Sequence, residues 1–243
     1  MPRGTWLASV RFQGVEHVHL TRVRLAPGGT WRDPGSYLVA QPDTFFAYTD
    51  TEPPRFEGAV HYLDDASGAS YARDAAGARP VISGDVDVVV GLRDVGEYAR
   101  QGTSAIADRL AVSRLAYEIA PVAGGDTLRQ LSLDFRTAEI PRLGAGGEAR
   151  IAQTVFAFYE RFHPGGTPAW RQSRVSYYVV TNTPPGGRTG VLSPADRDHA
   201  WRTADRRPDG TPRFPNGDYV VTVRAWDFKG NAAVRRDTVR VRN

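Results

Sequence analysis

The sequence has no cysteine, one methionine and one lysine, Lys229, among its 243 residues. The absence of cysteine excludes disulfides and thiolate metal sites. The positive charge therefore comes almost wholly from arginine, and the formal net charge is only +4 at pH 7. The arginines are scattered over alternating segments such as TRVRL at 21–25 and DTVRVRN at 237–243. This pattern indicates a solvated sheet face, and we expect no nucleic-acid partner, because such binding requires clustered basic side chains.

Long apolar segments are also missing. No run approaches the roughly 20 residues of a membrane-spanning helix, so we expect no membrane span. The N-terminal stretch MPRGTWLASVRFQG has no apolar central region and no small-residue cleavage site, so we recognise no signal peptide in it. With 41% hydrophobic and 24% charged residues, the composition is that of a folded globular protein. The length allows one large β domain or two small ones.

Apolar residues recur with a period of two almost throughout, which predicts an all-β protein. The segment GDVDVVVGLRD at 84–94 is a strong strand that places Val86, Val88 and Val90 on one face. The same period predicts strands at 5–12, 17–25, 53–63, 82–94, 110–120, 128–136, 174–183 and 199–205. Only 147–162 has apolar residues at helical spacing, and its second half, TVFAFYERF, fits a strand equally well.

Two alternating segments at the end of the chain predict a hairpin over 217–243. They flank the turn DFKGN, where Gly230 supplies the positive φ that a tight turn needs. The residues expected to face inward are Tyr219, Val221, Val223, Ala225, Val239 and Val241.

This hairpin resembles the last hairpin of bacterial immunoglobulin-like and fibronectin-like modules. The resemblance implies that Tyr219 is a core aromatic whose hydroxyl binds a backbone group, as in a tyrosine corner. Asp227 and Asn231 are expected to cap the turn through their side chains. Upstream, the double proline in YTDTEPPRF at 48–56 favours extended backbone and indicates a connector.

The stretch EHVHL places His17 and His19 one residue apart on a predicted strand. Alternate residues of a strand share a face, about 6–7 Å apart at Cα. Both imidazoles are therefore close enough to reach one metal ion. A catalytic zinc site needs three protein ligands and an open position for water, so the pair supplies at most two of them.

Together with WRDPGSYL and DTEPPRFEGAVHYL, the stretch VEHVHLTRVRL resembles the end of the catalytic domain of lysostaphin-like zinc endopeptidases (metallopeptidase family twenty-three). Those enzymes cleave peptide crosslinks in peptidoglycan and are exported. The resemblance implies that His19 is the zinc ligand and that His17 assists proton transfer. It also implies a short β remnant of the peptidase barrel at 1–49 and a connector at 50–55. An immunoglobulin/fibronectin-like β-sandwich would follow at 56–243, with an insertion at about 137–190.

The family takes its other two zinc ligands from an upstream His-x-x-x-Asp motif. The 16 residues before His17 contain neither His nor Asp, and we reject the downstream pair His61 and Asp65 as a substitute. We therefore expect no cofactor and no catalysis from this chain alone. The expected function is that of an accessory or substrate-positioning region of a peptidoglycan endopeptidase, periplasmic or secreted, with peptidoglycan or a cell-surface glycan or protein as partner. The alternatives are an extracellular immunoglobulin-like binding module unrelated to proteolysis, and a zinc endopeptidase completed by another chain.

Two further groups of side chains have a structural and a functional interpretation. Carboxylates could hold Ca²⁺, but without a dense acidic loop we expect solvated loop acids. These are Asp64, Asp65, Asp85, Asp87, Asp94 and Asp227. Aromatic side chains could form a sugar platform, but core packing is the better expectation for a large sandwich. These are Trp170, Tyr177, Tyr178 and Trp201.

Overall fold

The computed structural model describes residues 23–25, 28, 30, 37–39, 50–94, 112–134, 175–181 and 200–243. Within these ranges all regular secondary structure is β, as the period of two predicted. The strands are β1 (Val23–Leu25), β2 (Tyr37–Val39), β3 (Arg55–Asp64), β4 (Val81–Ile82), β5 (Asp85–Arg93), β6 (Arg114–Pro121), β7 (Leu128–Asp134), β8 (Ser176–Val179), β9 (Trp201–Arg202), β10 (Gly217–Trp226) and β11 (Ala232–Val241). The segments 5–12 and 147–162 lie outside the described residues.

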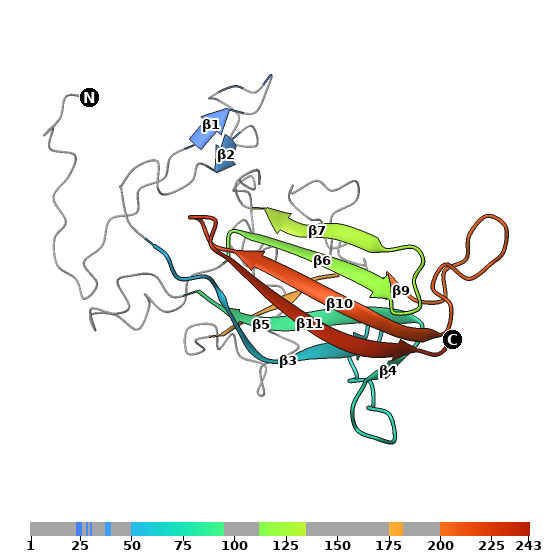
Figure 1. The fold of residues 1–243 in the computed structure, drawn as a ribbon. Coiled ribbons are helices and arrows are strands. Elements are labelled where there is room, and N and C mark those ends of the chain that lie inside the picture. Colours follow the sequence, from blue (N-terminus) through green and yellow to red (C-terminus); the bar gives the residue numbers. More distant parts are fainter. Residues whose placement is uncertain are drawn as a thin grey trace, which may run out of the picture.

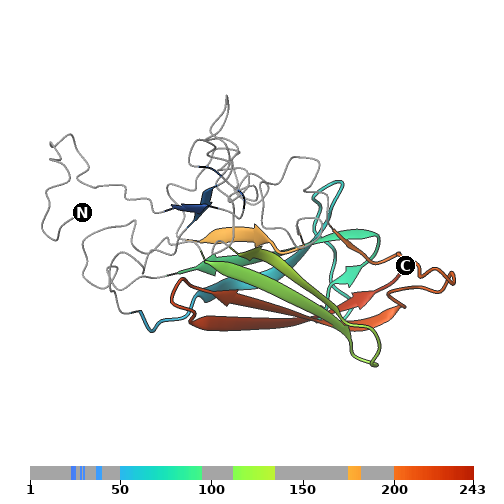
Figure 2. The ribbon, with the colours of Figure 1, turned by 90° about the horizontal axis from the view of Figure 1, so that it is seen from above.

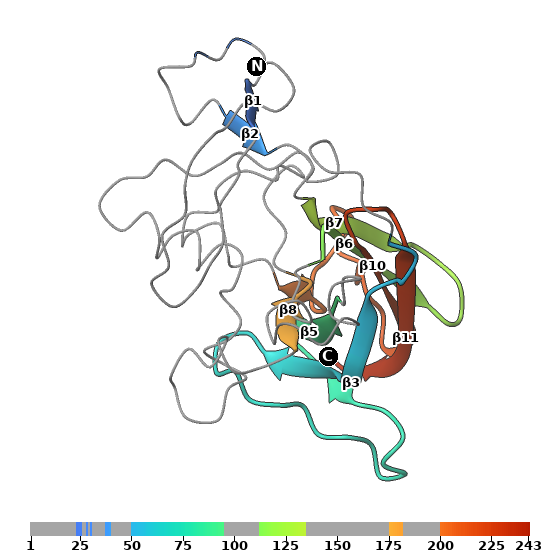
Figure 3. The ribbon, with the colours of Figure 1, turned by 90° about the vertical axis from the view of Figure 1, so that its left-hand side faces the viewer.

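Two sheets face each other across a shared core. One has five strands in the order β4-β11-β10-β6-β7, and the other is built on β3-β5-β8, with β9 also paired to β5. Figure 1 shows the five-stranded sheet in front of β3 and β5, and Figures 2 and 3 show the two layers from above and from the end. A separate antiparallel pair joins β1 and β2.

The predicted terminal hairpin is confirmed, and it supplies the centre of the five-stranded sheet. Gly217 to Trp226 pair antiparallel with Val241 to Ala232 around the turn at 227–231. Gly230 has φ = 92°, a value open to glycine and unfavourable for other residues. All the side chains expected to face inward are buried. Burial at alternate positions fixes the register, because a slip of one residue would turn this apolar row into solvent.

The prediction of one strand over 82–94 is wrong. Gly84 has φ = 70° and breaks the extended backbone, so the chain changes sheets at this point. β4, before the break, pairs parallel with β11 of the five-stranded sheet, whereas β5, after the break, pairs with β3. Local alternation carries no information about which sheet a residue joins. It therefore predicted one strand where the structure has two, β4 and β5.

β5 is buried on both of its faces. Val86, Val88 and Val90 face the core as expected, but Val89 on the opposite face is equally buried. A strand covered on both faces needs a near-continuous apolar run instead of alternation, and VDVVVGL is such a run. Gly91 completes it, since an added Cβ would lie 2.9 Å from the backbone oxygen of Glu57.

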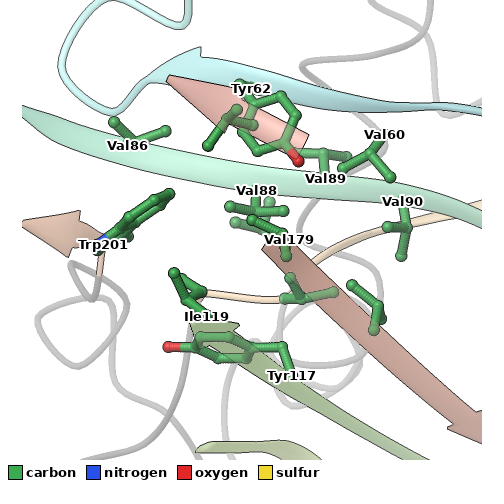
Figure 4. Close-up of a cluster of buried hydrophobic side chains, with 14 of the residues drawn as sticks. Val60, Tyr62, Val86, Val88, Val89, Val90, Tyr117, Ile119, Val179 and Trp201 are labelled. Carbon is green, nitrogen blue, oxygen red and sulfur yellow. The ribbon is translucent and has the colours of Figure 1, made fainter. Parts of the chain in front are cut away.

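The core joins the two sheets through side chains of β5, β6, β8 and β10. Figure 4 shows Val88 and Val179 from one sheet above Tyr117 and Ile119 from the other. Polar contacts also join the two sheets: the Ser132 hydroxyl donates a 2.5 Å hydrogen bond to the carbonyl oxygen of Val180, and the Arg235 side chain donates to that of Gly58 at 2.6 Å. β8, which supplies Val179, lies within the range 137–190 that the sequence suggested as an insertion.

Candidate functional site: a groove on the outer face of the five-stranded sheet

The histidines singled out in the sequence, His17 and His19, lie outside the described residues, as does Trp170. Within the described ranges, no three His, Asp or Glu side chains come together in a group that could hold a metal ion. The same ranges contain no helix long and apolar enough to cross a membrane. His61 lies on β3, where its ring contacts Tyr177 edge-on at a centroid distance of 6.4 Å.

The expectation of solvated loop acids is wrong for three of the six aspartates. Asp87, Asp94 and Asp227 are 2–3% exposed. Asp227 caps the hairpin turn as predicted: its carboxylate accepts hydrogen bonds from the Asn231 backbone at 2.9 Å and from the Asn231 side chain at 2.7 Å. The Asn231 side chain also donates to the carbonyl oxygen of Asp50 at 2.9 Å, so the hairpin turn contacts the chain just before β3.

The aromatic side chains belong to the core, which confirms the structural interpretation for two of them. Tyr178 and Trp201 are 1% exposed, and Tyr177 is partly buried against the core. Neither buried ring offers an open face for a sugar to stack on. These described aromatic side chains therefore do not form a sugar-binding platform.

The outer face of the five-stranded sheet is polar and rich in arginine. Alternation along β10 turns Thr222, Arg224 and Trp226 to this face, opposite the buried Val221, Val223 and Ala225. Across the ladder, Thr222 pairs with Glu118, Arg224 with Ala116 and Trp226 with Arg114. Arg236 of β11 lies beside Thr222 on the other side. The register thus brings side chains from three strands into neighbouring rows.

A groove of about 310 Å³ lies on this face over β6, β7 and β10, and we call it the outer-face groove. Small side chains, Ala116 and Thr222, form part of its lining at the centre of the sheet. Longer residues form the rest of the lining: Arg114, Tyr117, Glu118, Arg129, Gln130, Leu131 and Arg224. The groove exists because β6 and β10 place short residues between rows of long ones.

The three arginines of the groove differ in their partners. Arg129 is paired with Glu118 at 2.6 Å. The Arg114 Nε lies 3.9 Å from Asp134, beyond hydrogen-bond distance, and its guanidinium stacks over the Trp226 ring at 4.6 Å. Arg224 is exposed, and within the described part of the chain it has neither an ion pair nor a hydrogen bond. The groove therefore carries a guanidinium whose five N–H donors are open to a ligand.

The sequence indicated a solvated arginine face and no cluster of cations. Arg114, Arg129 and Arg224 are far apart in the chain, and only the pairing of β6 with both β7 and β10 brings them together. The signal available beforehand was the alternation in VTVRAW and SRLAYE, which places each arginine on an outer face. No protein-family model, no curated protein and no solved structure matches this chain.

Proposed function

We propose that this chain is a non-catalytic accessory region of a peptidoglycan endopeptidase, which positions the cell-wall polymer by binding its carboxylates in the outer-face groove. The unpaired Arg224 in that groove is the observation that carries the proposal. The link to peptidoglycan comes from the resemblance of the EHVHL stretch to lysostaphin-like enzymes. A periplasmic or secreted location belongs to the same proposal.

The proposed architecture is an immunoglobulin/fibronectin-like sandwich. Three features support it: β4 runs parallel to the last strand, β3 joins the opposite sheet, and β10 with β11 forms a terminal hairpin. The Tyr219 hydroxyl, bonded to the backbone a few residues upstream, is a fourth. In such a module, a groove on an exposed sheet face is a natural place for an extended ligand.

The chemistry of the groove favours carboxylates. A guanidinium binds a carboxylate through two parallel hydrogen bonds, and charge-assisted bonds of this kind are roughly twice as strong as neutral ones. Arg224 is free to form them, and Arg114 retains donors that Asp134 does not satisfy. Peptidoglycan stem peptides carry free carboxylates along an extended polymer, so they match both the charge and the open shape of the site.

Cosedimentation of the full chain with purified peptidoglycan sacculi tests the proposal. Arg224→Gln keeps the length and polarity of the side chain but removes the charge, and it should weaken binding about tenfold. Arg242→Gln is the matched control, because Arg242 is another exposed arginine without a side-chain partner among the described residues, and it should bind like the wild type. Sacculi whose carboxylates have been amidated should bind poorly.

Two results would overturn the proposal. Equal binding of Arg224→Gln and Arg242→Gln would remove the groove as the site. Failure of the wild type to sediment with sacculi would remove peptidoglycan as the ligand and leave an immunoglobulin-like binding module unrelated to proteolysis.

A further inference from the structure

Asn216 is the one asparagine in this sequence that is followed by glycine, and it lies directly before β10. It is exposed, and both polar atoms of its side chain bind the main chain of Asn243. Oδ1 accepts a hydrogen bond from the Asn243 backbone N–H at 2.7 Å, and Nδ2 donates to the Asn243 main-chain oxygen at 3.3 Å. We call these two hydrogen bonds the Asn216–Asn243 clamp. The clamp ties the chain just after β11 to the chain just before β10.

The residue that the clamp holds is bonded to the other sheet as well. The Asn243 side chain donates to the carbonyl oxygen of Thr203, which follows β9, at 2.7 Å. The Thr203 hydroxyl is within hydrogen-bond distance of both Asn243 Oδ1, at 2.7 Å, and the carbonyl oxygen of Gly84, at 2.9 Å. Gly84 is the point at which the chain changes sheets. Asn243 therefore joins the two sheets at this end, and the clamp holds it in position.

An asparagine that precedes glycine is open to an intramolecular reaction. The backbone nitrogen of the glycine attacks the side-chain Cγ, and a C–N bond forms. The bond from Cγ to Nδ2 breaks, and ammonia leaves with the proton of the attacking nitrogen. Water then opens the cyclic imide to aspartate or isoaspartate. Glycine favours ring closure because it has no Cβ and because its backbone reaches dihedral angles closed to other residues.

Three features of the structure favour this reaction at Asn216. Asn216 and Gly217 line a cavity of about 210 Å³, which gives room for the ring and access for water. Apart from its chain neighbours, no heavy atom lies within 4 Å of the place that a Cβ would take on Gly217. The Asn243 N–H donates to Oδ1, where negative charge develops when Cγ is attacked. A donor placed at that atom stabilises the transition state.

The attacking nitrogen lies at the end of a ladder. Gly217 and Val241 form the first pair between β10 and β11, and an end pair opens at little cost because further pairs hold it on one side only. Asn231, at the other end of the hairpin, differs in both respects. Ala232 follows it, and its side-chain amide donates to the buried carboxylate of Asp227 at 2.7 Å. Asn231 is therefore the internal control.

We propose that Asn216 is a site of spontaneous deamidation and that its conversion releases Asn243. The product carboxylate has no donor in place of Nδ2, so a negatively charged oxygen faces the main-chain oxygen of Asn243, and the two repel each other. Isoaspartate also lengthens the backbone by a methylene group, which displaces the start of β10 relative to β11. Neither Asn216 nor Asn243 lines the outer-face groove, so this inference goes beyond the proposed function and does not depend on it.

Peptide mass mapping of the full chain, aged at neutral pH and physiological temperature, tests the reaction. Trypsin separates the two asparagines, because Arg224 and Lys229 lie between them. Deamidation raises the mass of the Asn216 peptide, and isoaspartate methyltransferase labels the isoaspartate product. We expect Asn216 to convert about tenfold faster than Asn231. Asn216→Gln keeps the amide but requires a larger ring, and its peptide should keep its mass.

Hydrogen exchange of backbone amides tests the release of Asn243. The Arg242 N–H donates to the carbonyl oxygen of Ile82, and the Asn243 N–H donates within the clamp. In the aged chain and in Asn216→Asp both amides should exchange about tenfold faster than in the fresh wild type. The Asn231 amide, bonded to the turn, should exchange at the same rate in all three. The inference fails if Asn216 converts no faster than Asn231, or if Asn216→Asp leaves the exchange of both amides unchanged.

Discussion

The hydroxyl of Tyr219 donates a 2.8 Å hydrogen bond to the backbone carbonyl oxygen of Pro215, four residues upstream. The ring is 2% exposed and packs against Trp201 and Phe214, so the bond ties the loop before β10 to the core. This confirms the expectation that the Tyr219 hydroxyl finds a backbone partner. It also places the loop that carries Arg213 against a fixed aromatic cluster.

Removing this bond should cost stability without unfolding the chain. We expect Tyr219→Phe to lower the free energy of unfolding by about 1 kcal/mol, because the ring remains packed and only the hydroxyl is lost. Urea denaturation followed by circular dichroism measures the change. An unchanged free energy of unfolding would mean that the hydrogen bond from Tyr219 makes no net contribution to stability.

Two valines of the terminal hairpin allow the contribution of core burial to the free energy of unfolding to be measured. Val221 is fully buried on the inner face, whereas Val234 is 46% exposed on the outer face. Val221→Ala should lower the free energy of unfolding by about 2 kcal/mol, because buried apolar surface is lost and a cavity remains. The free energy of unfolding of Val234→Ala should lie within about 0.5 kcal/mol of the wild-type value. Similar losses in both variants would contradict the assignment of inner and outer faces.

His61 should make stability depend on pH. Burial lowers the pKa of His61 below 6.5, because the charged imidazolium is poorly solvated on the partly covered face of β3. Well above pH 6.5 the imidazole is neutral in both the folded and the unfolded chain, and the effect is absent. Below it the unfolded chain takes up the proton first, so stability falls until the pH passes the native pKa. His61→Gln should remove this slope, and an unchanged slope in denaturation across pH 7 to 5 would refute the assignment.

Asp218 should act in the more acidic range, with a dependence of the same sign. Hydrogen bonding to Arg240, with Nε 2.8 Å from Oδ1, and the charges of Arg240 and Arg79 lower the pKa of Asp218 below 3.8. The stabilisation is therefore complete well above pH 3.8 and is lost as the pH falls through the native value. Asp218→Asn should lower the thermal midpoint at neutral pH, and the difference should vanish in acid. A difference that persisted in acid would point to packing instead of charge.

Zinc content tests the expectation that the chain holds no complete metal site. With at most His17 and His19 as ligands, zinc should be lost on dialysis, because two histidines leave the ion without a preorganised site. Elemental analysis of the dialysed chain and of His19→Ala should give the same near-zero value. Stoichiometric zinc that disappears in the variant would instead support a zinc endopeptidase and overturn the accessory role.

The fold class could be predicted because local chemistry imposes it. Alternation of apolar residues marks strands whether or not their neighbours are known, and the turn DFKGN marks a hairpin through Gly230 and the capping pair Asp227 and Asn231. The inward rows of β10 and β11 follow from the same period. These features depend on residues close together in the chain, which is why the sequence contains them.

Sheet membership and the candidate sites were decided by tertiary structure. Gly84 divides a single alternating run between two sheets, and burial of β5 on both faces depends on what packs against it. The approach of Arg224 to Arg114 requires the register of β10 with β6. The sequence by itself determined the all-β class, the inward faces of the terminal hairpin and its closing turn. Pairing between distant strands decided which charges stand together, because that choice depends on contacts between residues far apart in the chain.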